Sequence, residues 1–129
     1  MYGCPNKDGS KRELIFPLFY QRNCEVFSFK DSNFTIQKDK ESCARVAIWR
    51  EFNIMNSFTL ETSFLGSNYG KYESFHFNKK LFMHMGETFL QSILDASDIS
   101  SEKFKEVTDE IEAKYSTKAL QSQMGETVL

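Results

Sequence analysis

The sequence is poor in the features that would place the chain in a specialised class. No apolar run approaches the roughly 20 residues that cross a membrane, and the first residues lack the apolar core of a signal peptide. The formal net charge of -2 offers no basic surface for nucleic acid or for an anionic membrane. We therefore expect neither nucleic acid nor a membrane as a partner.

Cysteine and histidine are also scarce. The chain has 3 cysteines and 2 histidines. The cysteines lie about 20 residues apart and form no CxxC pair, which excludes a disulfide framework and a zinc knuckle. We expect Cys4, Cys24 and Cys43 to be buried or partly exposed free thiols, in a reducing, cytoplasmic compartment.

The 129 residues suffice for one domain, and 13 phenylalanines predict an aromatic core or partner surface. A short helix with Pro17 in its first turn should end near Asn23. Two later segments carry apolar residues at helical spacing. The first runs over residues 78–96 with Leu81, Met85, Phe89 and Ile93, and the second over residues 101–116 with Phe104, Val107, Ile111 and Tyr115.

Two segments between these helices have the composition of strands. Residues 43–52 (CARVAIWREF) are rich in β-branched and aromatic side chains. Residues 58–64 alternate between apolar and polar, with Phe58 and Phe64 on one face and Glu61 on the other. The predicted fold class is therefore α/β, with few strands and with helices after them.

Several short stretches resemble the cytosolic carboxypeptidases, the zinc enzymes that trim glutamates from tubulin and other acidic protein tails. They are MYGC, IFP, KDKE followed by ARVAIWRE, and NSFTLETSFLGS. The resemblance runs from Met1 to about Asp95 and is most specific in RVAIWRE and NSFTLE. It implies the C-terminal portion of a zinc-carboxypeptidase-like α/β sandwich, with a few strands of a mixed sheet followed by two helices. Residues 1–98 would belong to that catalytic domain, and residues 99–129 would form a charged helix and a polar tail.

The resemblance assigns roles to two residues. Glu61 matches the strand glutamate that acts as general base on zinc-bound water, although its pattern alone is more simply a solvent-facing carboxylate on an edge strand. Arg45 matches a position that offers positive charge to an acidic substrate, for which a guanidinium fork is suited. Pairing with a neighbouring acid is an equally open interpretation of Arg45.

The zinc ligands that the resemblance implies, an HxxE pair and a later histidine, have no counterpart in this chain. His84 and Glu87 spell HxxE, but they follow the general base instead of preceding it. We interpret them as a helix-surface pair, because two histidines and one glutamate are few ligands for zinc. Zinc is thus expected in the intact family domain and not in this chain alone.

The predicted function is that of a fragment of a zinc metallocarboxypeptidase, inactive by itself, with acidic, tubulin-like tails as family substrates. The missing N-terminal half of the domain is a further expected partner, and microtubules or cilia are expected locations. The alternative is a non-catalytic binding or structural module derived from that fold. Residues 126–129 (ETVL) fit the C-terminal pattern that PDZ domains capture, which would suit a binding module.

Overall fold

Four α-helices carry the fold of the residues that the structure describes. The computed structural model describes residues 1–125, with side chains through residue 115, so the ETVL tail lies outside the described residues. The helices are α1 (Ile15–Asn23), α2 (Ala44–Phe52), α3 (Lys79–Ser97) and α4 (Glu102–Gly125). Single turns of 3-10 helix lie at Arg12–Leu14, Lys38–Lys40 and Gly70–Tyr72. None of the helices that the structure describes is long and apolar enough to cross a membrane.

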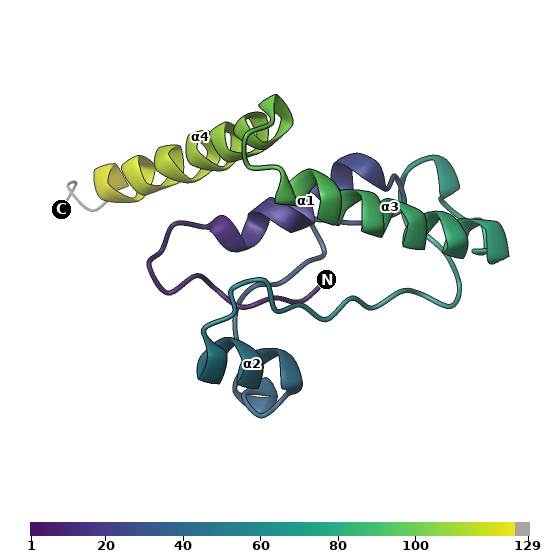
Figure 1. Ribbon diagram of the computed structural model, residues 1–129, viewed down its shortest axis with the longest axis horizontal. Helices are drawn as coiled ribbons and strands as arrows, with labels where there is room; N and C mark the ends of the chain where they lie inside the picture. The colour runs from purple at the N-terminus through teal and green to yellow at the C-terminus, as the bar shows by residue number, and fades with distance from the viewer. Residues whose placement is uncertain (126–129) are drawn as a thin grey trace.

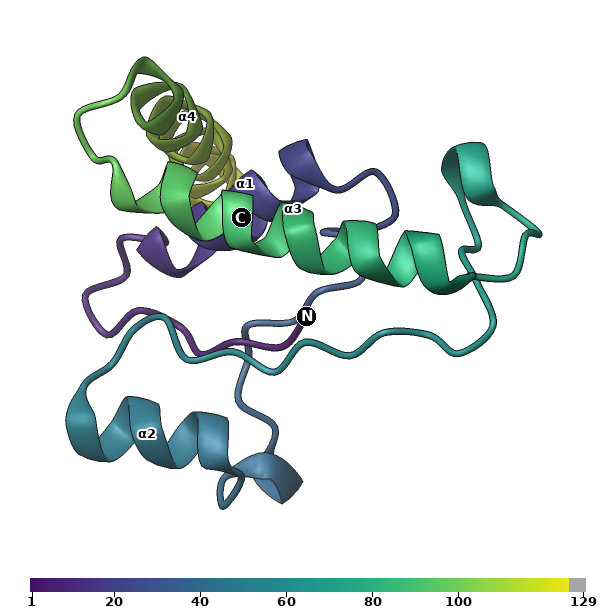
Figure 2. The ribbon, with the colours of Figure 1, turned by 45° about the vertical axis from the view of Figure 1, so that its right-hand side comes forward.

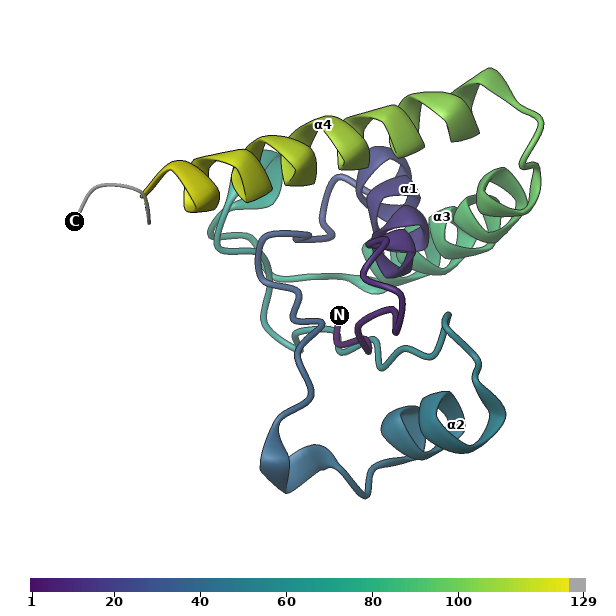
Figure 3. The same ribbon diagram turned by 90° about the vertical axis from the view of Figure 1, so that its left-hand side faces the viewer.

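Helix α1 is the centre of the molecule. It packs against α3 on one side and α4 on the other, and α4 crosses over it (Figure 3). Helix α2 lies apart from these three, beyond the extended segments (Figures 1 and 2). Because α1 is covered from two sides, every residue from Ile15 to Tyr20 is buried.

The hydrophobic core has two parts that meet at α1. Phe16 and Tyr20 face α3, in a cluster that includes Met85. Leu14, Ile15, Leu18 and Phe19 lie in a second cluster with Val107 and Ile111 of α4. The Phe16 ring lies 5.6 Å from the Phe58 ring and 5.3 Å from the Phe89 ring. The predicted aromatic core is confirmed.

The short helix predicted from Pro17 and the two helices predicted from periodicity are all present, but α4 ends at Gly125, beyond the predicted end at residue 116. Helix α1 contains Pro17 in its first turn and ends at Asn23. Helix α3 begins after Asn78, whose side-chain oxygen accepts a hydrogen bond from the Leu81 amide at 3.0 Å. The prediction that Ile93 belongs to the core-facing stripe of α3 is wrong, because Ile93 is 42% exposed.

The predicted α/β class is wrong for the residues that the structure describes. They contain four isolated β-bridges and no strand. Residues 43–52, predicted as a strand, form α2 instead. The segment has only two β-branched residues, Val46 and Ile48, among strong helix formers. A helix also satisfies its own backbone hydrogen bonds, whereas a strand requires neighbours.

Residues 58–64 are extended but do not form the predicted strand. A single antiparallel bridge joins Thr59 to Tyr2. Only Phe58 of the predicted apolar face is half-buried, while Leu60 is 38% and Phe64 is 95% exposed. One bridge cannot hold a strand, because sheets are stabilised by repeated cross-strand pairs.

Candidate functional site

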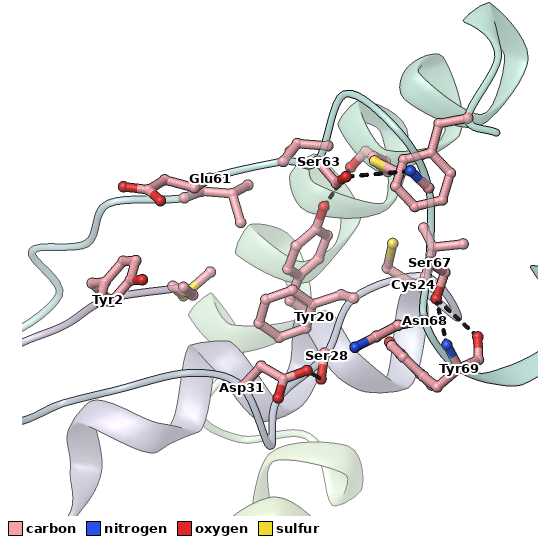
Figure 4. A pocket seen from close by; sticks show the side chains of 18 residues that line it. Tyr2, Tyr20, Cys24, Ser28, Asp31, Glu61, Ser63, Ser67, Asn68 and Tyr69 are labelled. Carbon is pink, nitrogen blue, oxygen red and sulfur yellow. Dashed lines mark hydrogen bonds between the residues drawn. The ribbon is translucent and has the colours of Figure 1, made fainter. Parts of the chain in front are cut away.

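Glu61 lies at the edge of a pocket of about 390 Å³. The N-terminal residues, α1, α3 and the two extended segments around residues 26–31 and 60–69 line it. Figure 4 shows the Glu61 carboxylate pointing away from Ser63 and Tyr20. The side chain is exposed, and among the described residues it makes no hydrogen bond or salt bridge. A carboxylate in this position can reach a solvent molecule or a ligand.

The segment that carries Glu61 is fixed at Thr59. The Tyr2 amide donates to the Thr59 carbonyl, and the Thr59 amide donates to the Tyr2 carbonyl, both at 2.8 Å. On its other side, Tyr2 is bridged to Asn33, so that three extended segments meet at Tyr2. These bonds hold the backbone two residues before Glu61.

Arg45 reaches the same junction from α2. Its Nη1 donates to the Thr59 hydroxyl at 3.1 Å, and its guanidinium lies 5.7 Å from the centre of the Tyr2 ring. Its Nε is buried and has no hydrogen-bond partner among the described residues. Of the two interpretations of Arg45, pairing with a neighbouring acid is not seen among these contacts, because the partner is the neutral Thr59 hydroxyl.

The pocket combines an apolar floor with acidic and hydroxyl groups. The Tyr20 hydroxyl donates to the Met85 carbonyl at 3.1 Å, and burial raises the pKa of this phenol well above its ordinary value. The Met1 α-amino group lies in the same region. Burial lowers the pKa of this amine, while the nearby carboxylates of Glu61 and Asp31 partly oppose that shift.

The three cysteines are free, as predicted. Cys4 and Cys24 are buried, and Cys43 is partly exposed. Cys24 lines the pocket and Cys4 packs beside Arg45, whose carbonyl it contacts through sulfur at 3.9 Å. Burial raises the pKa of the Cys4 thiol, which makes it a weak nucleophile near neutral pH.

The described side chains do not fit a zinc ion. A protein zinc site uses three or four ligands from His, Cys, Asp and Glu. No group of three or more such residues converges within the part of the chain with described side chains. His84 and Glu87 lie one turn apart on α3, whereas His76 lies in the preceding segment, with its Nδ1 3.1 Å from the Leu65 carbonyl.

Comparison with known proteins identifies relatives over most of the chain. Cytosolic carboxypeptidase 3 of Bos taurus is 40% identical over 117 residues, which is 87% of this chain and 12% of that protein. Cytosolic carboxypeptidase 2 of Xenopus tropicalis is 37% identical over 116 residues, and that of Homo sapiens is 35% identical over 114 residues. These alignments cover 87% and 86% of this chain, and 12% of each relative.

The chain belongs to the cytosolic carboxypeptidase family. It spans about an eighth of the length of the cytosolic carboxypeptidases that it matches. No family model matches it, and no solved structure gives a significant match.

The fold of this cytosolic carboxypeptidase segment brings the two predicted site residues to one junction without pairing them. Arg45 binds Thr59, and Glu61 follows two residues later. The sequence assigned no role to Thr59 or to Tyr2. No local sequence pattern could have indicated the contact between Tyr2 and Thr59, because the two residues are far apart in the chain and meet only in the folded structure.

Proposed function

We propose that this chain is part of a metallocarboxypeptidase that removes glutamates from acidic protein tails such as those of tubulin. Its contribution is Glu61, which acts as a general base and takes a proton from the attacking water. The observation that carries the proposal is the Glu61 carboxylate, exposed beside a pocket, on a backbone segment held by two hydrogen bonds at Thr59. An accessible carboxylate on a backbone segment that is held nearby suits proton transfer.

Arg45 has a supporting role in this proposal. One of its guanidinium nitrogens is bound to Thr59, which sets the direction of the group. A guanidinium has five N–H donors and Thr59 accepts from one of its Nη groups, so the Nη groups keep donor capacity for an acidic substrate side chain. The names of the relatives support a peptide-hydrolysing role.

Activity in this proposal requires more polypeptide than this chain. The described residues do not form a zinc site, so the metal ligands must come from elsewhere in a larger domain. The cytosolic relatives also support a location in the cytosol, and acidic tubulin tails would place the protein at microtubules or cilia.

The test compares the purified chain with a chimera of bovine cytosolic carboxypeptidase 3, in which this chain replaces the aligned segment. Zinc content and glutamate release from a peptide with a polyglutamate tail are measured for both. We expect release from the chimera only. Glu61→Gln in the chimera should reduce the rate by about a hundredfold or more. Glu87→Gln, an exposed carboxylate on α3, is the matched control and should leave the rate unchanged.

Three results would contradict the proposal. If the chimera with Glu61→Gln released glutamate at the rate of the unsubstituted chimera, Glu61 would not be the general base. A folded, zinc-loaded chimera without release would reject the catalytic contribution. Stoichiometric zinc and turnover by the chain alone would show that it builds its own metal site.

The second candidate is a non-catalytic binding or structural module. Its supporting observation is the number of exposed large apolar side chains, with Phe52, Phe64 and Ile99 each more than 70% exposed. Such residues are common at surfaces that bind other proteins. A chimera that folds but is inactive, together with stable binding of tubulin tails by the chain alone, would favour this candidate.

A further inference from the structure

Helix α3 has two apolar faces, and only one of them is covered. Its inner face carries Leu81, Met85 and Phe89, which pack against α1. The outer face carries five exposed apolar side chains and a glycine: Phe82, Met83, Gly86, Leu90, Ile93 and Leu94. Their exposed fractions run from 41% for Phe82 to 65% for Leu94. A helix of a stable domain that is apolar on both sides is usually buried on both sides.

Gly86 is an independent sign that the outer face of α3 contacts another polypeptide. Glycine weakens a helix relative to alanine, and Gly86 lies in the middle of α3. A Cβ atom built at Gly86 would meet nothing within 4 Å, so the described fold gives no reason for glycine here. A glycine at the centre of an apolar face lets another backbone approach closely.

We infer that the outer face of α3 is an internal packing surface. Its occupant is a part of the cytosolic carboxypeptidase polypeptide that this chain does not span, with the closest approach at Gly86. The inference rests on the proposed function, because that proposal makes this chain part of a larger domain. The bovine relative has 88% of its length outside the aligned region, which leaves ample polypeptide to cover this face. Between Phe82 and Leu94 this face carries no charged residue, as expected for an interior contact, and Lys79 lies on the same face in the first turn of the helix.

The test uses two methionines on the same helix. Met83 lies on the outer face and is 56% exposed, whereas Met85 lies on the inner face and is 8% exposed. Oxidation by hydrogen peroxide follows exposure, so in the isolated chain Met83 should be oxidised much faster than Met85. In the chimera with bovine cytosolic carboxypeptidase 3, Met83 should be oxidised at least about tenfold more slowly than in the isolated chain. Mass spectrometry of the α3 peptide measures both rates.

One matched pair of variants, and a third variant tested in both proteins, locate the contact. Leu90→Gln should lower the melting temperature of the chimera and restore the oxidation of Met83, while Glu87→Gln should do neither. Gly86→Ala should raise the melting temperature of the isolated chain by about 2–8 °C. In the chimera the same methyl group should lower the melting temperature, because the occupant approaches Gly86.

The outcomes separate this inference from the proposed function. Protection of Met83 in a chimera that releases no glutamate supports the packing surface and rejects the catalytic proposal. Glutamate release with Met83 oxidised as fast as in the isolated chain rejects the packing surface. Protection of Met83 that increases with the concentration of the isolated chain would make a second copy the occupant and overturn the inference. An equal rise in melting temperature with Gly86→Ala in chain and chimera would reject the close approach.

Discussion

The Arg45 guanidinium on α2 is hydrogen-bonded to the Thr59 hydroxyl at 3.1 Å, which joins a helix to the segment that carries Glu61. A second bond links the same elements, because the Ser57 hydroxyl donates to the Arg45 carbonyl at 2.8 Å. Val46 is the one residue of α2 that is buried. Polar contacts therefore hold much of α2 against the segment around Ser57 and Thr59.

Replacing Arg45 should loosen this attachment. Arg45→Ala removes the bond to Thr59 and the contact with the Tyr2 ring, and we expect it to lower the free energy of unfolding by about 1–2 kcal/mol. Arg50→Ala is the control, because Arg50 is exposed on the same helix and should cost less than about 0.5 kcal/mol. Urea denaturation measures both. Equal losses for the two variants would show that the Thr59 contact contributes nothing.

Stability should depend on pH above 10 through Tyr20. Burial raises the pKa of its hydroxyl above the ordinary value of 10.0. The folded state thus keeps a proton that the unfolded state releases. The stabilisation is complete below pH 10 and is lost as the pH rises towards the folded pKa.

The variant Tyr20→Phe isolates this effect. It should cost about 1 kcal/mol at pH 7, because the Met85 carbonyl loses a donor, and its stability should fall less between pH 9 and 11.5 than that of the parent. Urea midpoints across this range test the difference. Parallel curves for the two proteins would mean that Tyr20 does not titrate differently on unfolding.

A polar contact between α1 and α3 should make the stability of the fold depend on pH in the acid range. The Asn23 amide donates to Asp95 at 2.8 Å and to the Ser92 hydroxyl at 3.0 Å. The bond from Asn23 is the main cause that lowers the pKa of Asp95 below its ordinary 3.8, so the carboxylate contributes stability above that pH and loses it as the pH falls.

The variant Asn23→Ala should cost about 1–3 kcal/mol at pH 7, and it should make stability less dependent on pH below 4. Gln21→Ala, an exposed residue of the same helix, should change neither. Thermal unfolding at pH 7 and pH 3 provides the measurement. An unchanged acid response in Asn23→Ala would contradict the assignment to Asp95.

Apolar contacts, more than ion pairs, should hold α4 on α1. Ile111 is 4% exposed, and we expect Ile111→Ala to cost about 2–5 kcal/mol. The Arg22 pairs with Glu106 and Glu110, at 3.2 Å and 2.9 Å, lie at the surface, so Glu110→Gln should cost less than about 1 kcal/mol. Urea denaturation in low and high salt compares them. A larger loss for Glu110→Gln would reverse this ranking.

The sequence determined the helices with long apolar periodicity. The stripes of α3 and α4 appear every three or four residues, and both helices begin where the pattern places them, although α4 continues to Gly125. The sequence also determined family membership, because the stretches around Arg45 and Glu61 are specific enough to indicate relatives. Both kinds of information are local, so neighbouring residues suffice to express them.

Tertiary structure decided the form of residues 43–64. Their aromatic and alternating apolar residues led to the prediction of strands, but a strand needs partners along its length, and Thr59 has one bridge to Tyr2. Residues 44–52 instead form a helix, which supplies its own backbone partners. The positions of Arg45 and Glu61 around Thr59 follow from that choice. They depend on contacts between distant segments, which no local pattern encodes.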